Sequence, residues 1–266
     1  MKLFLIITKL LLICFYYSYS ASQIPYTLKK VGITENIGIS INKNIFLENY
    51  DLNSYTLDFF FTQSKPLVVF FGYYTCPMLC HYVANGVVQL LNQTSLVLGK
   101  DFNLLMLSIN PNDDASTAND FAKNYLSKLN ENLDGNAWYF MTASSDVISQ
   151  FTTSLGFFYR HDVKSDQFAH SAAIIVLTPK GIVSRYLYGI NFNPFDFKMS
   201  ILEANKENVS SNLDKLLLFC YNYDPQNKTY VILAKKLMQL GGLFIIFFII
   251  FIMWCFNRNR KINFKK

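Results

Sequence analysis

The chain has little cysteine, histidine or charge for its length. Its 266 residues include five cysteines and three histidines, and charged residues make up 16% of the composition. The net charge of +6 comes partly from a basic tail, NRNRKINFKK (257–266), so it is not evidence for nucleic-acid binding. We find no internal repeat, which excludes a repeat array. Apolar residues are abundant, at 52%, and they gather at the two ends of the chain.

The first twenty residues (1–20) have the pattern of a secretory signal peptide. Two lysines precede an apolar run, and the small residues Ser18 and Ser20 stand just before Ala21, where cleavage is expected. An uncleaved membrane anchor is the alternative. A lipoprotein signal at Cys14 is disfavoured, because bulky residues precede this cysteine.

A second apolar run, LMQLGGLFIIFFIIFIMWCF (237–256), predicts one transmembrane helix. Twenty residues at a rise of about 1.5 Å span the ~30 Å hydrocarbon core. The basic tail at 257–266 favours a cytoplasmic C-terminus. We therefore expect a single-pass protein of the inner membrane whose main part faces the periplasm.

The part between the two ends is long enough for one domain with extensions. We expect a linker at 21–39, a globular domain at 40–205 and a juxtamembrane extension at 206–236. Of the five cysteines, only Cys76, Cys80 and Cys220 lie between the ends. An odd number of cysteines in an oxidising compartment indicates chemistry rather than a structural disulfide framework.

Hydrophobic periodicity in the domain alternates between strand and helix. We predict strands at 54–63, 65–72, 101–110, 138–142, 171–178 and 182–189, and helices at 77–94, 113–129, 144–156 and 194–205. The last two strands are joined by a TPKG turn and form a hairpin. This α/β order fits a thioredoxin-like sandwich, followed by a C-terminal extension and one transmembrane helix.

The stretch TCPMLC places Cys76 and Cys80 four residues apart, directly after a predicted buried strand. Because proline is favoured at the first helical position, we expect Cys76 to cap the helix, where the helix dipole favours a thiolate. In a regular helix the Cβ atoms of such a pair lie about 5–6 Å apart, against roughly 3.8 Å in a disulfide. The spacing favours a shared soft metal ion, with a reversible disulfide, a structural disulfide or two inert buried cysteines as alternatives.

The three histidines are candidates for a further ligand. His81 points about 100° away from Cys80 on the helix, and His161 lies next to an arginine, so we expect neither to bind a metal. His170, in QFAHSAAIIVLT, begins a strand whose edge we expect at the same end of the sheet as Cys76. On spacing alone, His170 is either a third ligand or a hydrogen-bonding residue.

Three segments together resemble the Sco/SenC family of thioredoxin-like copper proteins that help to assemble cytochrome c oxidase. They are VVFFGYYTCPMLCHYVANGVVQLL, QFAHSAAIIVLTPKGIVSRYLYG and LLLFCYNYDPQNKTY, and the resemblance, to the bacterial branch with a C-terminal membrane anchor, covers about residues 40–255. It implies copper, as Cu(I) or Cu(II), bound by Cys76, Cys80 and His170. Family members often have SIDP where this chain has SINP, so a role for that carboxylate does not transfer to Asn110.

Two thiolates and one imidazole suit Cu(I), whereas zinc normally takes four ligands. Together with this donor set, the resemblance implies a non-enzymatic metallochaperone that takes copper from a donor protein and delivers it to the copper-receiving subunit of cytochrome c oxidase. The alternative is a thiol–disulfide oxidoreductase that keeps the cysteines of that subunit reduced, with Cys76 as attacking and Cys80 as resolving thiol. Peroxide reduction is a weaker third hypothesis. His170 separates the first two, because thiol exchange does not need it.

Overall fold

The computed structural model describes residues 31–206, 221–224 and 229–232, and residues 242, 244–248, 251, 252 and 254. The chain divides into two units, which are described separately. The larger unit comprises Glu35–Gly156 and Ala172–Lys266, and the smaller comprises Met1–Thr34 and Phe157–Ser171.

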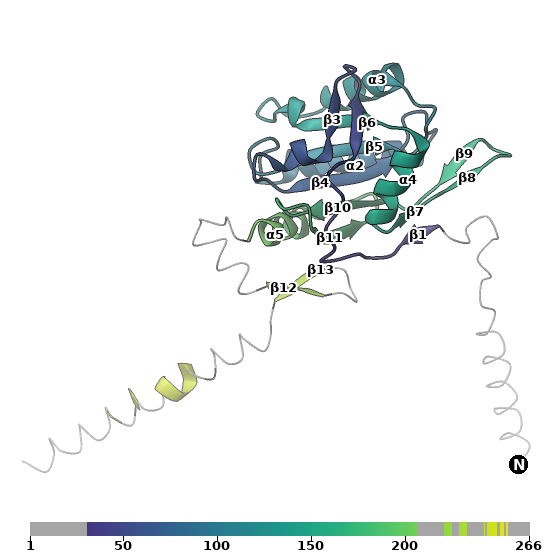
Figure 1. Ribbon diagram of the computed structural model, residues 1–266. Helices are drawn as coiled ribbons and strands as arrows, with labels where there is room; N and C mark the ends of the chain where they lie inside the picture. The colour runs from purple at the N-terminus through teal and green to yellow at the C-terminus, as the bar shows by residue number, and fades with distance from the viewer. Residues whose placement is uncertain are drawn as a thin grey trace, which may run out of the picture. The chain divides into compact units, whose positions relative to one another are not determined.

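A seven-stranded mixed sheet forms the centre of the larger unit (Figure 1). The strand order is β11-β10-β4-β5-β6-β2-β3, in which β4, β5 and β6 are parallel and the outer strands pair antiparallel. The strands are β2 (Phe46–Asn49), β3 (Ser54–Thr56), β4 (Leu67–Gly72), β5 (Asn103–Ser108), β6 (Trp138–Thr142), β10 (Ala173–Leu177) and β11 (Val183–Tyr188). A separate hairpin is formed by β12 (Tyr221–Asp224) and β13 (Thr229–Ile232).

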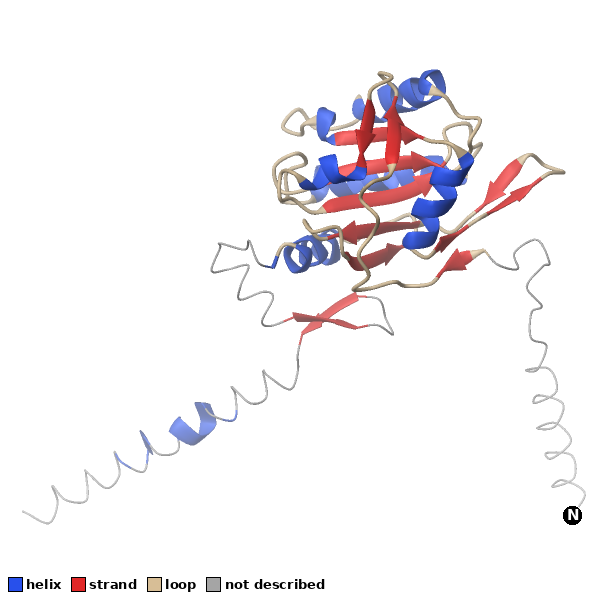
Figure 2. Ribbon diagram, in the orientation of Figure 1, coloured by secondary structure: helices blue, strands red, loops and turns tan. Residues whose placement is uncertain are grey.

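Helices cover both faces of this sheet, with α2 and α4 on opposite sides (Figure 2). The helices are α2 (Leu79–Gln93), α3 (Ala115–Leu126), α4 (Ser145–Ser154) and α5 (Pro194–Ala204), with short 3-10 helices η2 (Leu57–Phe61) and η3 (Gly135–Ala137). Successive side chains of a strand point to opposite faces. Accordingly, Phe70 joins the core under α2, α3 and α5, whereas Phe71 meets Phe151 of α4, with ring centroids 5.6 Å apart.

The smaller unit contains two antiparallel strand pairs. β1 (Gly32–Ile33) pairs with β7 (Phe157–Phe158), and β8 (Arg160–Asp162) pairs with β9 (Gln167–Ala169).

The predicted α/β order is confirmed, and two local predictions are wrong. The stretch 54–63 is not one strand, because β3 ends at Thr56 and the 3-10 helix η2 begins at Leu57. The buried residues of η2, Leu57, Phe60 and Phe61, follow the spacing of a tight helical turn. The helix after β4 begins at Leu79 with Met78 as N-cap, so Cys76 precedes the helix instead of capping it.

The expected single-pass membrane protein, facing the periplasm from the inner membrane, is contradicted. None of the helices in the described residues has the length and apolarity needed to cross a membrane. The expected signal peptide (1–20) and basic tail (257–266) lie outside the described residues, as does Cys220.

Candidate metal centre

The two cysteines lie where the central strand β4 leads into α2. A turn follows β4, closed by a hydrogen bond of 3.2 Å from the backbone N–H of Cys76 to the carbonyl oxygen of Tyr73. Cys80 is the second residue of α2. Cys76 and Cys80 are both thiols rather than a disulfide, and both are buried, at 5% and 1% exposure. The structure therefore brings the predicted pair together in a buried position.

Each sulfur accepts a backbone hydrogen bond from within this segment. The N–H of Cys80 donates to Sγ of Cys76 at 3.4 Å, and the N–H of Tyr73 donates to Sγ of Cys80 at 3.3 Å. Hydrogen bonds to the charged form of a group favour that form. The backbone is thus arranged to stabilise sulfur anions, which are the metal-binding form of cysteine.

In the absence of a metal ion, however, Cys80 keeps its thiol proton. A hydrogen bond with the Cys76 side chain raises the pKa of the Cys80 thiol, and burial raises it further. Burial, together with the charges of the two cysteines, raises the pKa of Tyr125 to about 12. A metal ion bound by both sulfurs would therefore have to displace the Cys80 proton.

Gly72 leaves room for the sulfur of Cys80. A Cβ atom at this last residue of β4 would lie 3.1 Å from Sγ of Cys80 and 3.2 Å from Cε of Met106. Both distances are shorter than ordinary van der Waals contacts. A side chain at position 72 would thus displace the sulfur or the Met106 side chain.

A buried carboxylate, Asp113, holds the cysteine-bearing loop in place. Its Oδ2 accepts hydrogen bonds from the N–H of Tyr74, at 2.5 Å, and from the hydroxyl of Ser108, at 2.7 Å. Its Oδ1 accepts from the hydroxyl of Thr75, at 2.9 Å, and from the amide of Asn110, at 3.0 Å. Asp113 therefore ties the residues just before Cys76 to the end of β5.

Asn110, where this chain differs from the SIDP pattern, belongs to the same hydrogen-bond network. Its Nδ2 donates to Asp113 and, at 3.3 Å, to the hydroxyl of Thr75. An aspartate at position 110 would place a second carboxylate about 3 Å from Asp113, where like charges repel. The asparagine supplies a donor where Asp113 needs one.

Each histidine makes a hydrogen bond within its own unit. Nδ1 of His81 lies 2.7 Å from the hydroxyl of Tyr125, and Nε2 of His161 lies 2.8 Å from Asp166 on the β8–β9 hairpin. Nδ1 of His170 lies 2.9 Å from the carbonyl oxygen of Ser171. Because a carbonyl oxygen only accepts, this Nδ1 carries the proton and the lone pair of the neutral ring is on Nε2, as in many metal-binding histidines.

The grouping of His170 with the two cysteines stays a prediction. Within the described part of the chain, no three His, Cys, Asp or Glu side chains are grouped so that they could hold a metal ion. The cysteines belong to the larger unit, and His170 belongs to the smaller one. The donor chemistry nevertheless fits a soft ion, since two sulfurs and an imidazole nitrogen are ligands that Cu(I) accepts.

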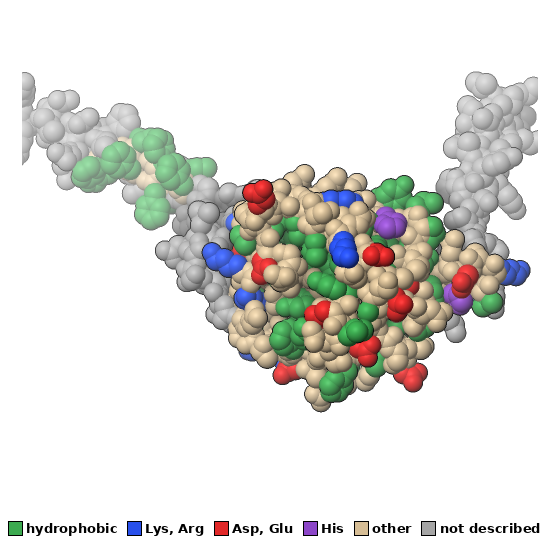
Figure 3. All heavy atoms as spheres, turned by 90° about the horizontal axis from the view of Figure 1, so that it is seen from above, with side chains coloured by type: hydrophobic (Ala, Val, Ile, Leu, Met, Phe, Trp, Pro, Cys, Tyr) green, Lys and Arg blue, Asp and Glu red, His purple; other side chains and the backbone are tan. Residues whose placement is uncertain are grey.

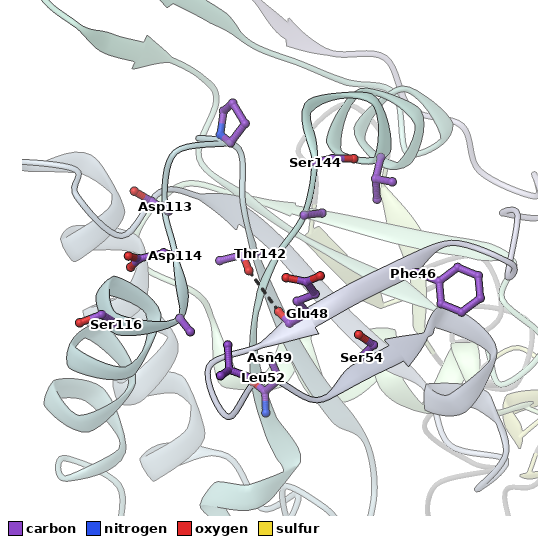
Figure 4. Close-up of a pocket in the computed structure, with 14 residues that line it drawn as sticks. Phe46, Glu48, Asn49, Leu52, Ser54, Asp113, Asp114, Ser116, Thr142 and Ser144 are labelled. Carbon is purple, nitrogen blue, oxygen red and sulfur yellow. Dashed lines mark hydrogen bonds between the residues drawn. The ribbon is translucent and has the colours of Figure 1, made fainter.

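A separate hollow of about 700 Å³ lies between the β2–β3 hairpin and the first turns of α3 and α4. Figure 4 draws the residues that line it. Glu48, Asp113 and Asp114 contribute carboxylates to its lining, whereas neither cysteine does. The described residues around it include no lysine, arginine or histidine. It is thus distinct from the sulfur pair, although Asp113 touches both regions.

The role of Asp113 was not predicted from the sequence, although a signal for it exists. Asp113 follows β5, and Cys76 follows β4, its parallel neighbour. Because the carboxyl ends of parallel strands meet at one sheet edge, residues after adjacent strands are brought together. An acidic residue after one strand and a cysteine after the next therefore point to a shared site.

Replacing Asp113 by asparagine is expected to destabilise the fold despite the equal size of the side chains. Four donors face the two carboxylate oxygens, two donors to each oxygen. In either orientation of an asparagine amide, its nitrogen would face two donors and could not accept their hydrogen bonds. Leaving buried donors unsatisfied costs about 1–3 kcal/mol. Urea denaturation of Asp113→Asn measures this loss in the free energy of unfolding. The control is Asp120→Asn, at an exposed position of α3, and equal stability of the two variants would contradict the assignment.

Comparisons with known proteins agree with this architecture. The family model SCO1/SenC matches residues 53–200. A structure from Aquifex aeolicus VF5, provisionally assigned to electron transfer, is 22% identical and covers 66% of this chain and 98% of its own, with a TM-score of 0.57. BsSco, a member of the Sco family of cytochrome c oxidase assembly proteins with an identified disulfide switch, is 19% identical and covers 65% and 98%, with a TM-score of 0.52.

Yeast Sco1, solved with copper bound, is 21% identical and covers 66% of this chain and 94% of its own, with a TM-score of 0.48. No curated protein sequence matches significantly. The structural likeness confirms the predicted thioredoxin-like fold, and the family model covers more than half of the 266 residues. The chain belongs to the SCO1/SenC family.

Proposed function

We propose that this protein carries copper on Cys76, Cys80 and His170 and delivers it to the copper centre of cytochrome c oxidase during assembly. Copper is the cargo, so the protein is not an enzyme in the sense of turnover. A donor protein supplies the ion, and the copper-receiving subunit of the oxidase accepts it.

Family membership supports copper and the oxidase as its destination. BsSco is described as belonging to a family of oxidase assembly proteins, and yeast Sco1 has been solved with copper bound. The donor set points the same way, because thiolates and imidazole suit Cu(I), whereas structural zinc takes four ligands.

The observation that carries the proposal is the arrangement of the two buried thiols. Each sulfur receives a backbone N–H, and the two thiols share a hydrogen bond that leaves the proton on Cys80. A cation that replaces this proton would be held between two sulfurs in a preorganised pocket. As each Cu–S bond forms, a thiol proton leaves to solvent.

The second candidate function is thiol–disulfide exchange, which the same pair of sulfurs favours. Cys76 would attack a disulfide of the oxidase subunit, and Cys80 would resolve the mixed disulfide. The electrons would come from the two thiols, so their oxidation to a Cys76–Cys80 disulfide balances the reduction of the target. This reaction does not involve His170.

Titration of the reduced chain with Cu(I), in competition with bicinchoninate, tests the copper assignment. One tightly bound ion is expected, and Cys76→Ser or Cys80→Ser is expected to abolish its binding. Loss of a residue that only hydrogen-bonds to a metal ligand typically lowers metal affinity roughly 10–100-fold. Because His170 is proposed to be a ligand itself, His170→Ala should lower the Cu(I) affinity by more than this. It should leave exchange with a disulfide substrate intact.

Two matched controls accompany this titration. His161→Ala removes an imidazole that is bonded to Asp166, and Cys220→Ser removes a thiol outside the pair. Both should bind copper like the wild type. Unchanged affinity in His170→Ala would refute the ligand set, and absence of Cu(I) binding in the wild type would leave thiol exchange as the function.

Copper affinity is expected to rise with pH. Because the pKa of Cys80 is raised, its thiol is protonated through the neutral range and the ion must displace that proton. The apparent affinity should therefore increase about tenfold per pH unit for each proton released. The same titration between pH 6 and pH 8 measures this slope, and a flat profile would show that the bound ion displaces no proton.

A further inference from the structure

Met78 places a third sulfur in the segment that carries the two cysteines, and this sulfur belongs to an exposed side chain. Met78 is 62% exposed, whereas Cys76 and Cys80 are 5% and 1% exposed. Thioethers and thiolates are both soft donors that select Cu(I). The segment therefore carries one exposed soft side chain and two buried ones.

Neither helix capping nor burial accounts for a methionine at this position. Met78 is the N-cap of α2, and its side chain makes no capping hydrogen bond. Polar residues are favoured at an N-cap because their oxygen accepts an N–H of the first turn. The N-caps of α3 and α5, Asp114 and Asn193, do accept such bonds.

Exposure alone would not single out Met78, because isolated apolar side chains are common on protein surfaces. Figure 3 shows apolar side chains interspersed with charged ones on one face of this molecule. Met78 differs in lying two residues from each cysteine on a fixed backbone. Its carbonyl oxygen accepts hydrogen bonds from the N–H groups of His81 and Tyr82, at 3.1 and 3.2 Å.

An incoming Cu(I) ion can bind first only to a donor atom that is accessible from solvent. Copper passes between proteins by ligand exchange, in which the new donor contacts the ion while the old ligand still holds it. Thiols that are 5% and 1% exposed meet an incoming complex poorly. An exposed thioether two residues from each of them in the sequence can make the first contact.

We propose that the Met78 thioether is the first donor to bind incoming Cu(I), before the ion passes to Cys76 and Cys80. This inference rests on the proposed copper-carrying function. The ion remains Cu(I) throughout, each step replaces one ligand bond by another, and the thiol protons leave to solvent. Met78 is not a ligand in the final complex, and the ion leaves along the same path.

Stopped-flow measurement on the reduced full chain tests this order of binding. Cu(I) is supplied as its bicinchoninate complex, and release is followed with excess bicinchoninate. Met78→Leu keeps an apolar side chain of similar size, and Met78→Ser supplies a helix cap. Both variants should slow uptake and release by the same factor, so that the affinity at equilibrium is unchanged.

The serine variant separates this role from a structural one. A cap at position 78 is expected to keep the thermal midpoint at or above that of the wild type, so slower uptake in this variant would not come from damage to the fold. Tyr82→Leu is the control, because Tyr82 is also exposed, at 52%, one turn further along α2. It should show wild-type rates.

The outcomes distinguish this inference from the function on which it rests. Wild-type rates in both Met78 variants would overturn the inference and leave the copper function standing. A weakened affinity with an unchanged uptake rate would also overturn it, since Met78 would then be a ligand of the final complex. If the wild type takes up no Cu(I), the proposed function itself fails.

Discussion

The hydrogen-bonded pair of buried sulfurs is the constraint on which the rest of the site depends. β4 is buried along its whole length, so it fixes the point at which the chain leaves the sheet. Gly72 then lets Sγ of Cys80 pack against the strand end, and the N–H of Tyr73 is directed at that sulfur. Any shift of the intervening loop would separate the two sulfurs, which explains why the loop is held by several interactions.

The loop is held by a buried carboxyl group that accepts several hydrogen bonds. Asp113 receives four donors, two of them from the loop and two from the segment around the end of β5. Tyr74 adds a second anchor, because its hydroxyl donates to the carbonyl oxygen of Met141 at 2.9 Å. Burial, with the charge of Asp113, raises the pKa of Tyr74 well above its usual value, so this donor stays protonated. Loop geometry and core packing are thus parts of one network.

Much of the larger unit follows from the sequence, because its elements have strong periodicity. The apolar runs that become β4, β5 and β6, and the helical spacing of α2, identify the central layers, and parallel pairing places Cys76 at a sheet edge. The start of α2 was misplaced because Pro77 is also compatible with a turn before the helix. The hairpins β2–β3 and β8–β9 are too short for periodicity to reveal them.

Other features depend on contacts between residues that are distant in sequence. The hydrogen bonds from Tyr74 and Thr75 to Asp113 join residues that are 39 and 38 positions apart. No local sequence pattern encodes such contacts. The apolar composition of 237–256 predicted a membrane span that the described helices do not support. His170 as a ligand came from resemblance to a family, since a histidine at the start of a strand serves equally well as a hydrogen-bonding residue.

X-ray absorption at the copper edge of the loaded, reduced chain tests the central claim most directly, because it counts the donor atoms around the ion. The account predicts two sulfur scatterers and one imidazole nitrogen, with the nitrogen signal lost in His170→Ala and the sulfur signal retained. A spectrum with sulfur alone, or an imidazole signal that persists in that variant, would contradict it.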